Sequence, residues 1–218
     1  MARWRGRRVW WAVAGVLVVA LAVALVVTWP LVRRYTGAAP PAQFYEKVQL
    51  EPALAQDYGQ VLGVAHNAGP TPGTLATALR DGAGVTKLDL MQTDHKFLDE
   101  LVAFLTARPR SRRVMISSRD PAALLYLHRR LPGATLLFSV PFPDAVHQLQ
   151  SDHALQQAIG GASVFQGLVD ANLVSWMHEH KLIIVAWTVN ESERFNQLVR
   201  LGVDGITTAN LAILRALR

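Results

Sequence analysis

Two polar side chains stand at or near the ends of apolar stretches that have the character of β-strands. His66 follows residues 61–65, VLGVA, and Asp89 lies near the end of residues 85–90, VTKLDL. In a sheet built from βα units, the carboxyl ends of neighbouring strands share one edge, where loops converge on rigid supports. Histidine and carboxylate groups at that edge are suited to proton transfer and to ligand binding. The sequence therefore predicts a candidate site there.

The stretches that must position these residues alternate between strand and helix patterns. Residues 44–58 are expected to form a short lead-in with helical character, and Asp120 followed by Pro121 is typical of a helix start. The predicted strands cover 61–65, 85–90, 113–118, 135–140, 163–168, 182–189 and 202–208, and the predicted helices cover 74–80, 97–107, 122–131, 144–157 in one or two pieces, 172–180, 190–201 and 211–217.

Such alternation predicts a parallel sheet with right-handed crossovers. About seven strands can be counted in the sequence. The predicted fold class is α/β, a TIM-type (βα) barrel that is reduced or imperfectly closed, or a sheet that stays open. One transmembrane helix is expected before it.

That helix is predicted over residues 9–29, which are uncharged and almost wholly apolar. At a rise of about 1.5 Å per residue, a helix of this length crosses a hydrocarbon core of about 30 Å. Trp10, Trp11 and Trp29 lie at its two ends, where indole rings favour the headgroup level. A cleaved signal peptide is the alternative, but its apolar region is shorter, about 7–15 residues, and is followed directly by small residues.

Arginines flank the predicted helix on both sides, and the larger cluster precedes it. The positive-inside rule then places the amino terminus in the cytoplasm. We expect a single-pass protein of the cell membrane with an extracytoplasmic carboxyl-terminal domain. Its predicted parts are a basic tail (1–8), a transmembrane signal anchor (9–29), a Pro-rich tether (30–43) and one folded domain (44–218).

The charge of the chain reflects this topology. The net charge is +6, and six of the 22 basic residues are arginines within the first 34 residues, which contain no Asp or Glu. The remainder carries 16 basic and 16 acidic residues, so nothing in its balance supports nucleic-acid binding. The chain has no cysteine, which excludes disulfides, zinc–thiolate sites and thiol catalysis.

Both ends of the predicted domain resemble one family, the glycerophosphodiester phosphodiesterases. Residues 66–93 resemble its amino-terminal signature in order: His66, the loop, Thr74-Leu75-Ala76, Gly82-Ala83, Leu88-Asp89-Leu90 and Thr93. Residues 185–190, VAWTVN, and 202–208, GVDGITT, resemble its last two strands, and residues 113–139 its middle strand–helix–strand. The resemblance implies a TIM-type barrel that hydrolyses glycerophosphodiesters with two histidines and a divalent metal held by carboxylates.

The resemblance assigns roles to individual residues. His66 matches the first catalytic histidine, and Asp89 matches the aspartate of the paired acidic motif. Lys87 stands where that motif has a glutamate, Pro72 where a second glutamate is expected, and Asn67 where the histidine is followed by an arginine. Ca²⁺ and Mg²⁺ need several oxygen ligands, so these departures predict that the family's metal site is lost.

The second catalytic histidine is also displaced. Between residues 93 and 112 the family places two further strands, one of them ending in that histidine, but this chain has room only for a helix. His95 is the candidate second acid–base residue, and a solvent-facing residue at the start of a helix is the alternative.

Lys87 has two interpretations. Its ammonium group could take the metal's electrostatic place beside a phosphoryl group while His66 and a second histidine exchange protons. It could instead pair with Asp89 in a purely structural ion pair, with catalysis lost. The catalytic candidates are therefore His66, Lys87 and His95, with no metal ligands assigned.

The expected function follows from these candidates. We predict a membrane-anchored, glycerophosphodiester phosphodiesterase-like protein that acts on or recognises glycerophosphodiesters or phospholipid headgroups. A catalytically inactive binding module for a phosphorylated polyol or lipid headgroup is the alternative. No cofactor is expected, apart from Ca²⁺ or Mg²⁺ if the family's metal site survives. The candidate substrate-binding residues are Asn67, Asp89, Trp187 and Asn190; Asn190 could instead cap the following helix.

Overall fold

The computed structural model describes residues 48–58, 61–65, 86–107, 114–210 and 212–213 of the chain. The predicted anchor at 9–29, the tether and the helix at 74–80 lie outside these residues. Within the described part, no helix is long and apolar enough to cross a membrane. All described elements belong to one compact unit, residues 39–218.

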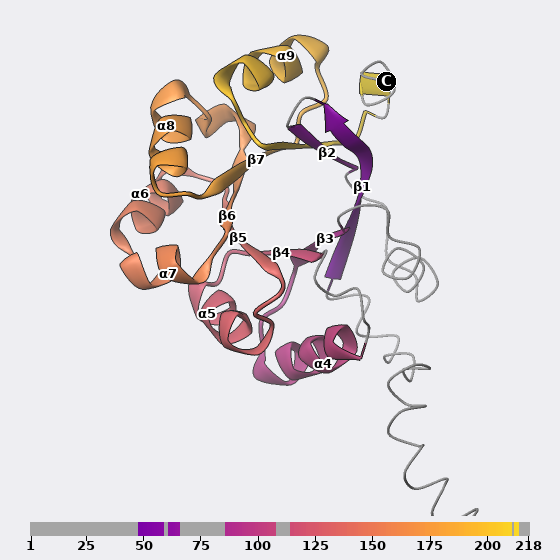
Figure 1. Ribbon diagram of the computed structural model, residues 1–218, viewed down its shortest axis with the longest axis vertical. Helices are drawn as coiled ribbons and strands as arrows, with labels where there is room; N and C mark the ends of the chain where they lie inside the picture. Colours follow the sequence, from indigo (N-terminus) through magenta and orange to yellow (C-terminus); the bar gives the residue numbers. More distant parts are fainter. Residues whose placement is uncertain (1–47, 59–60, 66–85, 108–113, 211, 214–218) are drawn as a thin grey trace, which may run out of the picture. The chain divides into compact units, whose positions relative to one another are not determined.

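Eight strands form a closed barrel in the order β1-β2-β8-β7-β6-β5-β4-β3 (Figure 1). The pairs from β3 through β8 are parallel, and β2 is also parallel to β8. The strands are β1 (Val48–Tyr58), β2 (Val61–Ala65), β3 (Thr86–Leu90), β4 (Val114–Ser118), β5 (Thr135–Val140), β6 (Gly161–Phe165), β7 (Ile183–Trp187) and β8 (Gly205–Thr208).

The first strand corrects two expectations from the sequence. Residues 48–58 form β1, although a helical lead-in was expected over 44–58. β1 runs antiparallel to both β2 and β3 and lies between them in the sheet. This additional strand closes the ring, so the described sheet is neither open nor imperfectly closed.

Helices follow the strands from β3 to β7, as the alternation predicts. They are α4 (His95–Thr106), α5 (Pro121–Arg130), α6 (Pro143–Ser151), α7 (His153–Ala158), α8 (Ala171–Glu179) and α9 (Ser192–Leu201), with a short 3₁₀ turn at Gln166–Leu168. In Figure 1 these helices lie outside the ring of strands. The predicted helix over 144–157 is therefore two helices, with Asp152 as the N-cap of the second.

The hydrophobic core lies between the strands and these helices. Side chains alternate between the two faces of a strand. Leu88, Ile116 and Phe138 point outward and are almost completely buried in the core cluster, whereas their neighbours Lys87, Ser117 and Ser139 do not belong to it. The interior of the barrel is therefore more polar than its outer wall.

Aspartates begin four of the helices. Asp94, Asp120, Asp152 and Asp170 each accept a hydrogen bond from a backbone amide in the first turn of the helix that follows. Such caps satisfy amide groups that have no partner inside the helix. For α4, α5 and α8 they bring carboxylates to the edge of the barrel where strands β3, β4 and β6 end.

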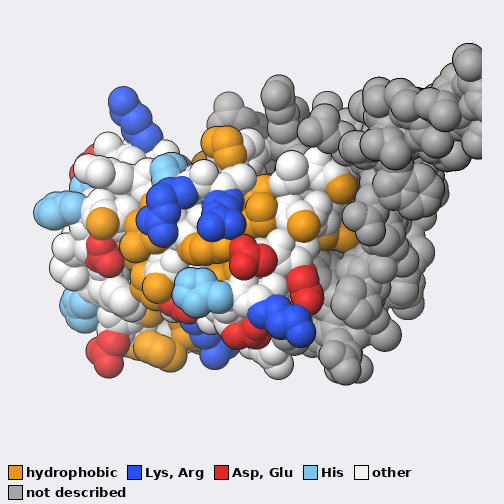
Figure 2. Space-filling model, turned by 90° about the horizontal axis from the view of Figure 1, so that it is seen from below, with side chains coloured by type: hydrophobic (Ala, Val, Ile, Leu, Met, Phe, Trp, Pro, Cys, Tyr) orange, Lys and Arg blue, Asp and Glu red, His pale blue; other side chains and the backbone are white. Residues whose placement is uncertain are grey.

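Helices α4 and α5 are joined on the outer surface by a polar cluster. The Tyr126 hydroxyl donates to Asp99, which also accepts from Arg130 at 3.1 Å, and the Arg130 guanidinium lies 4.5 Å from the Tyr126 ring centroid. Figure 2 views the molecule from the side of these helices and shows acidic and basic side chains close together.

This cluster predicts a shifted tyrosine titration. The hydrogen bond to Asp99 raises the pKa of Tyr126 above its ordinary value of 10.0. Only the protonated phenol can donate, so the stabilisation from this bond is present at neutral pH and is lost as the pH rises through the raised pKa. Asp99→Asn should bring the titration back toward the ordinary value. Tyrosinate absorbance, with Tyr126→Phe to identify the signal, measures the shift; an unchanged titration in Asp99→Asn would contradict this assignment.

Candidate functional site

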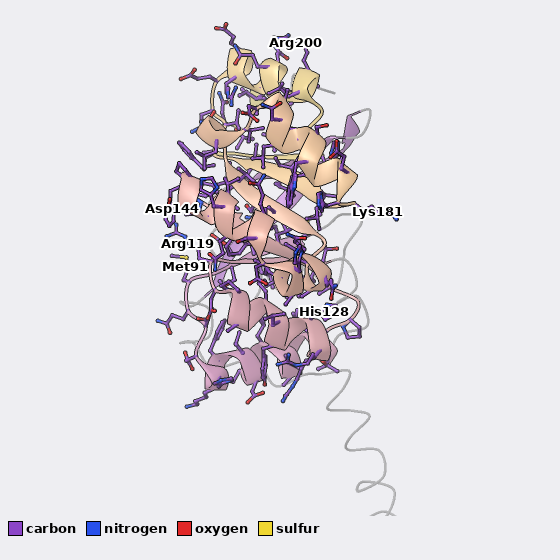
Figure 3. All side chains as sticks on the ribbon, turned by 90° about the vertical axis from the view of Figure 1, so that its left-hand side faces the viewer. Met91, Arg119, His128, Asp144, Lys181 and Arg200 are labelled. Atoms are coloured by element: carbon purple, nitrogen blue, oxygen red, sulfur yellow. The ribbon has the colours of Figure 1, made fainter. Side chains whose placement is uncertain are left out.

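A cavity of about 370 Å³ opens at the carboxyl edge of the barrel strands. Its walls come from the ends of β3 to β7 and from the loops that follow β3 and β4. In Figure 3, Met91 and Arg119 lie on one side of the barrel, and His128 and Lys181 lie on the opposite side. The lining residues are Lys87, Asp89, Leu90, Met91, Gln92, Thr93, Ser118, Arg119, Asp120, Ser139, Ser163 and Trp187.

Strand β3 supplies two of the charged residues that line the cavity. Lys87 and Asp89 are two positions apart, so both side chains project from the same face of the strand. Lys87 is only 3% exposed, and Asp89 is partly exposed. The Asp89 Oδ1 accepts a hydrogen bond of 2.7 Å from Ser117 Oγ, whose residue is the register partner of Asp89 on β4. The carboxylate is thus oriented by the neighbouring strand.

Buried hydroxyl groups form the next part of the wall. Ser139 on β5 and Ser163 on β6 are register partners and are almost completely buried. Ser118, at the end of β4, accepts a hydrogen bond of 3.1 Å from the backbone amide of Asp120. Serine hydroxyls can donate to an anionic oxygen or accept from a hydroxylated ligand. This wall can therefore bind an oxygen-rich group.

Trp187 closes the cavity at the end of β7. Its ring packs edge-on against Phe165, with centroids 5.9 Å apart. Its Nε1 is buried and has no hydrogen-bond partner among the described residues. A buried indole N–H normally has a partner, and none of the described residues supplies one.

The structure brings together three of the predicted residues, Lys87, Asp89 and Trp187. It places two others elsewhere. His95, the first residue of α4, is exposed, does not line the cavity, and packs edge-on against Tyr126 with ring centroids 5.4 Å apart. Its role as an acid–base residue stays a prediction without support from this placement.

Asn190 connects two loops at the carboxyl edge. Its side-chain oxygen accepts from Ala209 N at 2.9 Å, and its backbone oxygen accepts from Asn210 Nδ2 at 3.1 Å. It is not part of the cavity wall. The alternative prediction that Asn190 caps the following helix is wrong, because Glu191 is the N-cap residue of α9 and makes no side-chain cap bond. Asn190 instead joins the loop after β7 to the end of β8.

His66 and Asn67 lie outside the described residues, so their predicted roles stay predictions. Strand β2, which ends at Ala65 directly before them, is described. Because β2 is parallel to β8, its carboxyl end lies at the same edge of the barrel as the carboxyl end of β8.

The described residues do not make a divalent-cation site. They contain no group of three or more His, Asp or Glu side chains that could hold a metal ion. Two carboxylates line the cavity, but Asp120 Oδ1 caps α5 by accepting from Ala122 N at 2.9 Å. Asp89 is hydrogen-bonded to Ser117 and projects from the same face of β3 as the cationic residue Lys87. A cation at this position disfavours binding of a second one.

The fold and cavity together define a βα-barrel protein with its candidate site at the carboxyl edge of the strands. The profile of the glycerophosphoryl diester phosphodiesterase family matches residues 27–212. The chain belongs to this family, which confirms the resemblance seen in the sequence. It is a divergent and shortened member. Enzymes of the family generally depend on a divalent cation.

Solved structures support the fold. A protein from Galdieria sulphuraria, assigned as a glycerophosphodiester phosphodiesterase, is 18% identical over 76% of this chain and 68% of its own, with a TM-score of 0.55. A glycerophosphoryl diester phosphodiesterase from Parabacteroides distasonis is 17% identical over 74% of this chain and 62% of its own, with a TM-score of 0.50.

A third structure, assigned to the same activity, comes from Silicibacter pomeroyi. It is 27% identical over 57% of this chain, with a TM-score of 0.48, and the chain spans 45% of its length, about half. No curated protein matches the sequence.

Nine residues of the wall were not among the site residues predicted from the sequence: Leu90, Met91, Gln92, Thr93, Ser118, Arg119, Asp120, Ser139 and Ser163. Ser139 and Ser163 each interrupt a hydrophobic strand at a position whose side chain faces the barrel interior. A polar residue inside an otherwise apolar strand is the signal that could have identified them, because a buried hydroxyl needs a partner.

Proposed function

We propose that this protein recognises the phosphodiester group of a glycerophosphodiester or phospholipid headgroup in the cavity at the barrel mouth. The observation that carries the proposal is the buried Lys87 in the wall of that cavity. An ammonium group shielded from water interacts strongly with a phosphate anion. The family membership and the size of the cavity agree with a ligand of this kind.

Four side chains of the wall contact the ligand in the proposed complex. Lys87 neutralises the phosphoryl charge, and the hydroxyls of Ser139 and Ser163 donate to its oxygens or to the glycerol hydroxyls. Trp187 provides an apolar surface beside them. No step of the proposed binding requires a metal ion.

Hydrolysis at the same site is the second candidate, and the position of His66 after β2 favours it. In that case Lys87 stabilises the charge that develops on the phosphoryl group, while His66 transfers a proton. Both candidates share the binding step, and they differ only in whether the phosphodiester bond is broken.

We further propose that the barrel acts next to a membrane, anchored by residues 9–29 with its amino terminus in the cytoplasm. The support is the apolar sequence and the arginines on either side of it. A carboxyl-terminal reporter enzyme active only in the cytoplasm would overturn this topology.

Binding and hydrolysis can be measured in one experiment. The purified full chain, in detergent or nanodiscs, is titrated calorimetrically with glycerophosphocholine, glycerophosphoethanolamine and glycerophosphoglycerol, and the products are followed by ³¹P NMR with EDTA or with added Ca²⁺ or Mg²⁺. We expect at least one compound to bind with EDTA present. Absence of binding under every condition would overturn the proposal.

The variant His66→Ala separates the two candidates. Metal-independent cleavage that this variant abolishes would establish a lysine-assisted phosphodiesterase. Binding without cleavage, unchanged in His66→Ala, would establish a recognition module. Cleavage that requires a metal would contradict the proposed loss of the family's metal site. His147→Ala is the matched control, because His147 is exposed on α6 and does not line the cavity.

A further inference from the structure

Large apolar side chains are exposed around the mouth of the cavity. Among the described residues, four large hydrophobic side chains are exposed: Met91 at 63%, Phe142 at 54%, Phe165 at 41% and Val199 at 37%. Met91 directly follows β3, Phe142 lies just after β5, and Phe165 is the last residue of β6. We call Met91, Phe142 and Phe165 the apolar rim, because all three lie at the edge of the barrel where the cavity opens.

The position of Phe165 is set by its surroundings. The next residue, Gln166, donates through Nε2 to Thr188 O at 2.6 Å, and its own carbonyl oxygen accepts from Arg194. The Phe165 ring also contacts Trp187. Because the backbone next to Phe165 is held from two sides, the exposed ring belongs to an ordered part of the rim.

Phe142 occupies a place where a polar residue is usual. It is the N-cap residue of α6, yet it makes no side-chain cap hydrogen bond. Ser, Thr, Asp and Asn are preferred there, as at the starts of α4, α5 and α8. With phenylalanine in this position, α6 lacks the usual side-chain cap hydrogen bond. The exposed aromatic ring contributes an apolar surface to the rim.

The cavity and its rim therefore differ in polarity. Lys87, Ser139 and Ser163 make the interior polar, and the rim outside it is apolar. A ligand that matches both surfaces has a charged head and a hydrocarbon tail. We propose that the ligand carries an acyl chain, as a lysophospholipid does, and that this chain lies against the apolar rim while the phosphodiester occupies the cavity. This inference rests on the proposed function and defines its ligand class.

The acyl chain accounts for the exposed rim better than a free headgroup does. A glycerophosphodiester without an acyl chain ends at the glycerol hydroxyls and leaves the rim in water. Burying apolar surface is favourable by about 0.8 kcal/mol for each methylene group, so a six-carbon chain that contacts the rim over part of its length should strengthen binding about tenfold to a hundredfold.

The test compares two ligands that differ only in the chain. The full-length protein in nanodiscs is titrated with glycerophosphocholine and with its 1-hexanoyl ester, below the ester's micelle concentration, and again with the corresponding ethanolamine pair. Empty nanodiscs correct for partitioning of the ester. The variants are the double substitution Phe142→Ala with Phe165→Ala, and Val199→Ala as a control that removes an exposed apolar side chain on α9, away from the rim.

We expect the ester to bind at least tenfold more tightly than the parent compound in the wild type and in Val199→Ala. That advantage should fall to less than threefold in the Phe142/Phe165 variant, while the affinity for the parent compound stays the same. Equal binding of both compounds by the wild type would overturn the inference and leave the proposed function intact, as would an advantage that survives the double substitution. Failure of both compounds to bind would overturn the proposed function itself.

Discussion

Replacing Lys87 with methionine should weaken the binding of glycerophosphodiesters about 30-fold or more. Removing one partner of a buried, hydrogen-bonded charge pair costs about 2–5 kcal/mol, and 1.4 kcal/mol corresponds to a tenfold change. Methionine is unbranched and keeps much of the volume of the lysine stem, so the variant removes mainly the charge. Calorimetric titration of the wild type and of Lys87→Met with the same compound measures the effect.

Lys96→Met is the matched control for this substitution. Lys96 is exposed at the start of α4 and does not line the cavity, so its removal should leave the affinity within about twofold of the wild type. Circular dichroism spectra of the two variants establish that both are folded. A folded Lys87→Met protein that binds as tightly as the wild type would show that the phosphodiester does not lie beside Lys87.

The largest loss of stability is expected at Gly161, where β6 begins. A Cβ atom at this position would lie 2.1 Å from the backbone oxygen of Ile183 and 2.5 Å from its Cγ1. Gly161 and Ile183 are register partners on neighbouring strands, so the strands would have to separate to make room. Gly161→Ala should therefore lower the free energy of unfolding by about 3 kcal/mol or more.

The neighbouring residue provides the control. A Cβ atom on Gly160 would meet the Cγ2 methyl group of Thr135 at 2.9 Å, and its nearest backbone atom would be 3.9 Å away. Rotation of the threonine side chain can relieve that contact, so Gly160→Ala should cost about 1 kcal/mol or less. Chemical denaturation of the full chain compares the two variants. If both variants lost a similar amount of unfolding free energy, the close contact between β6 and β7 could not be the cause of the loss in Gly161→Ala.

Most of the barrel could be predicted because its local sequence agrees with its tertiary structure. The runs at 61–65 and 135–140 coincide with β2 and β5, since apolar strand residues there end at polar or proline-containing loops. Asp120 and Pro121 begin α5 as predicted, because the cap bond and the fixed proline backbone act within a few residues of sequence. Local rules were sufficient for these elements.

Strand β1 could not be predicted from local rules. Its sequence, VQLEPALAQDY, contains leucine, alanine and glutamine, which favour helices, and it lacks a strict alternation. Its conformation comes from pairing with β2 and β3, including residues more than 30 positions away along the chain. Barrel closure was missed for the same reason: β1 completes the ring, but its sequence does not have the pattern of a strand.

The candidate site was predicted in part. Lys87, Asp89 and Trp187 could be found because they stand in or next to the motifs that resemble the family. Their convergence with Ser139 and Ser163 depends on strand register, which the sequence does not specify across separate βα units. The rim residues Phe142 and Phe165 read as ordinary apolar residues at element boundaries, and only their exposure distinguishes them.

The pairing of β2 with β8 has a consequence for biosynthesis. Residues 61–65 pair with residues 205–208, so the ring cannot close until residues 205–208 have left the ribosome. Until then β2 and β7 each present a row of unpaired backbone groups, which can pair with another chain. A nascent chain of this protein is thus most exposed to misassembly between the synthesis of β7 and that of β8, and the short strand β8 ends that period by joining both edges.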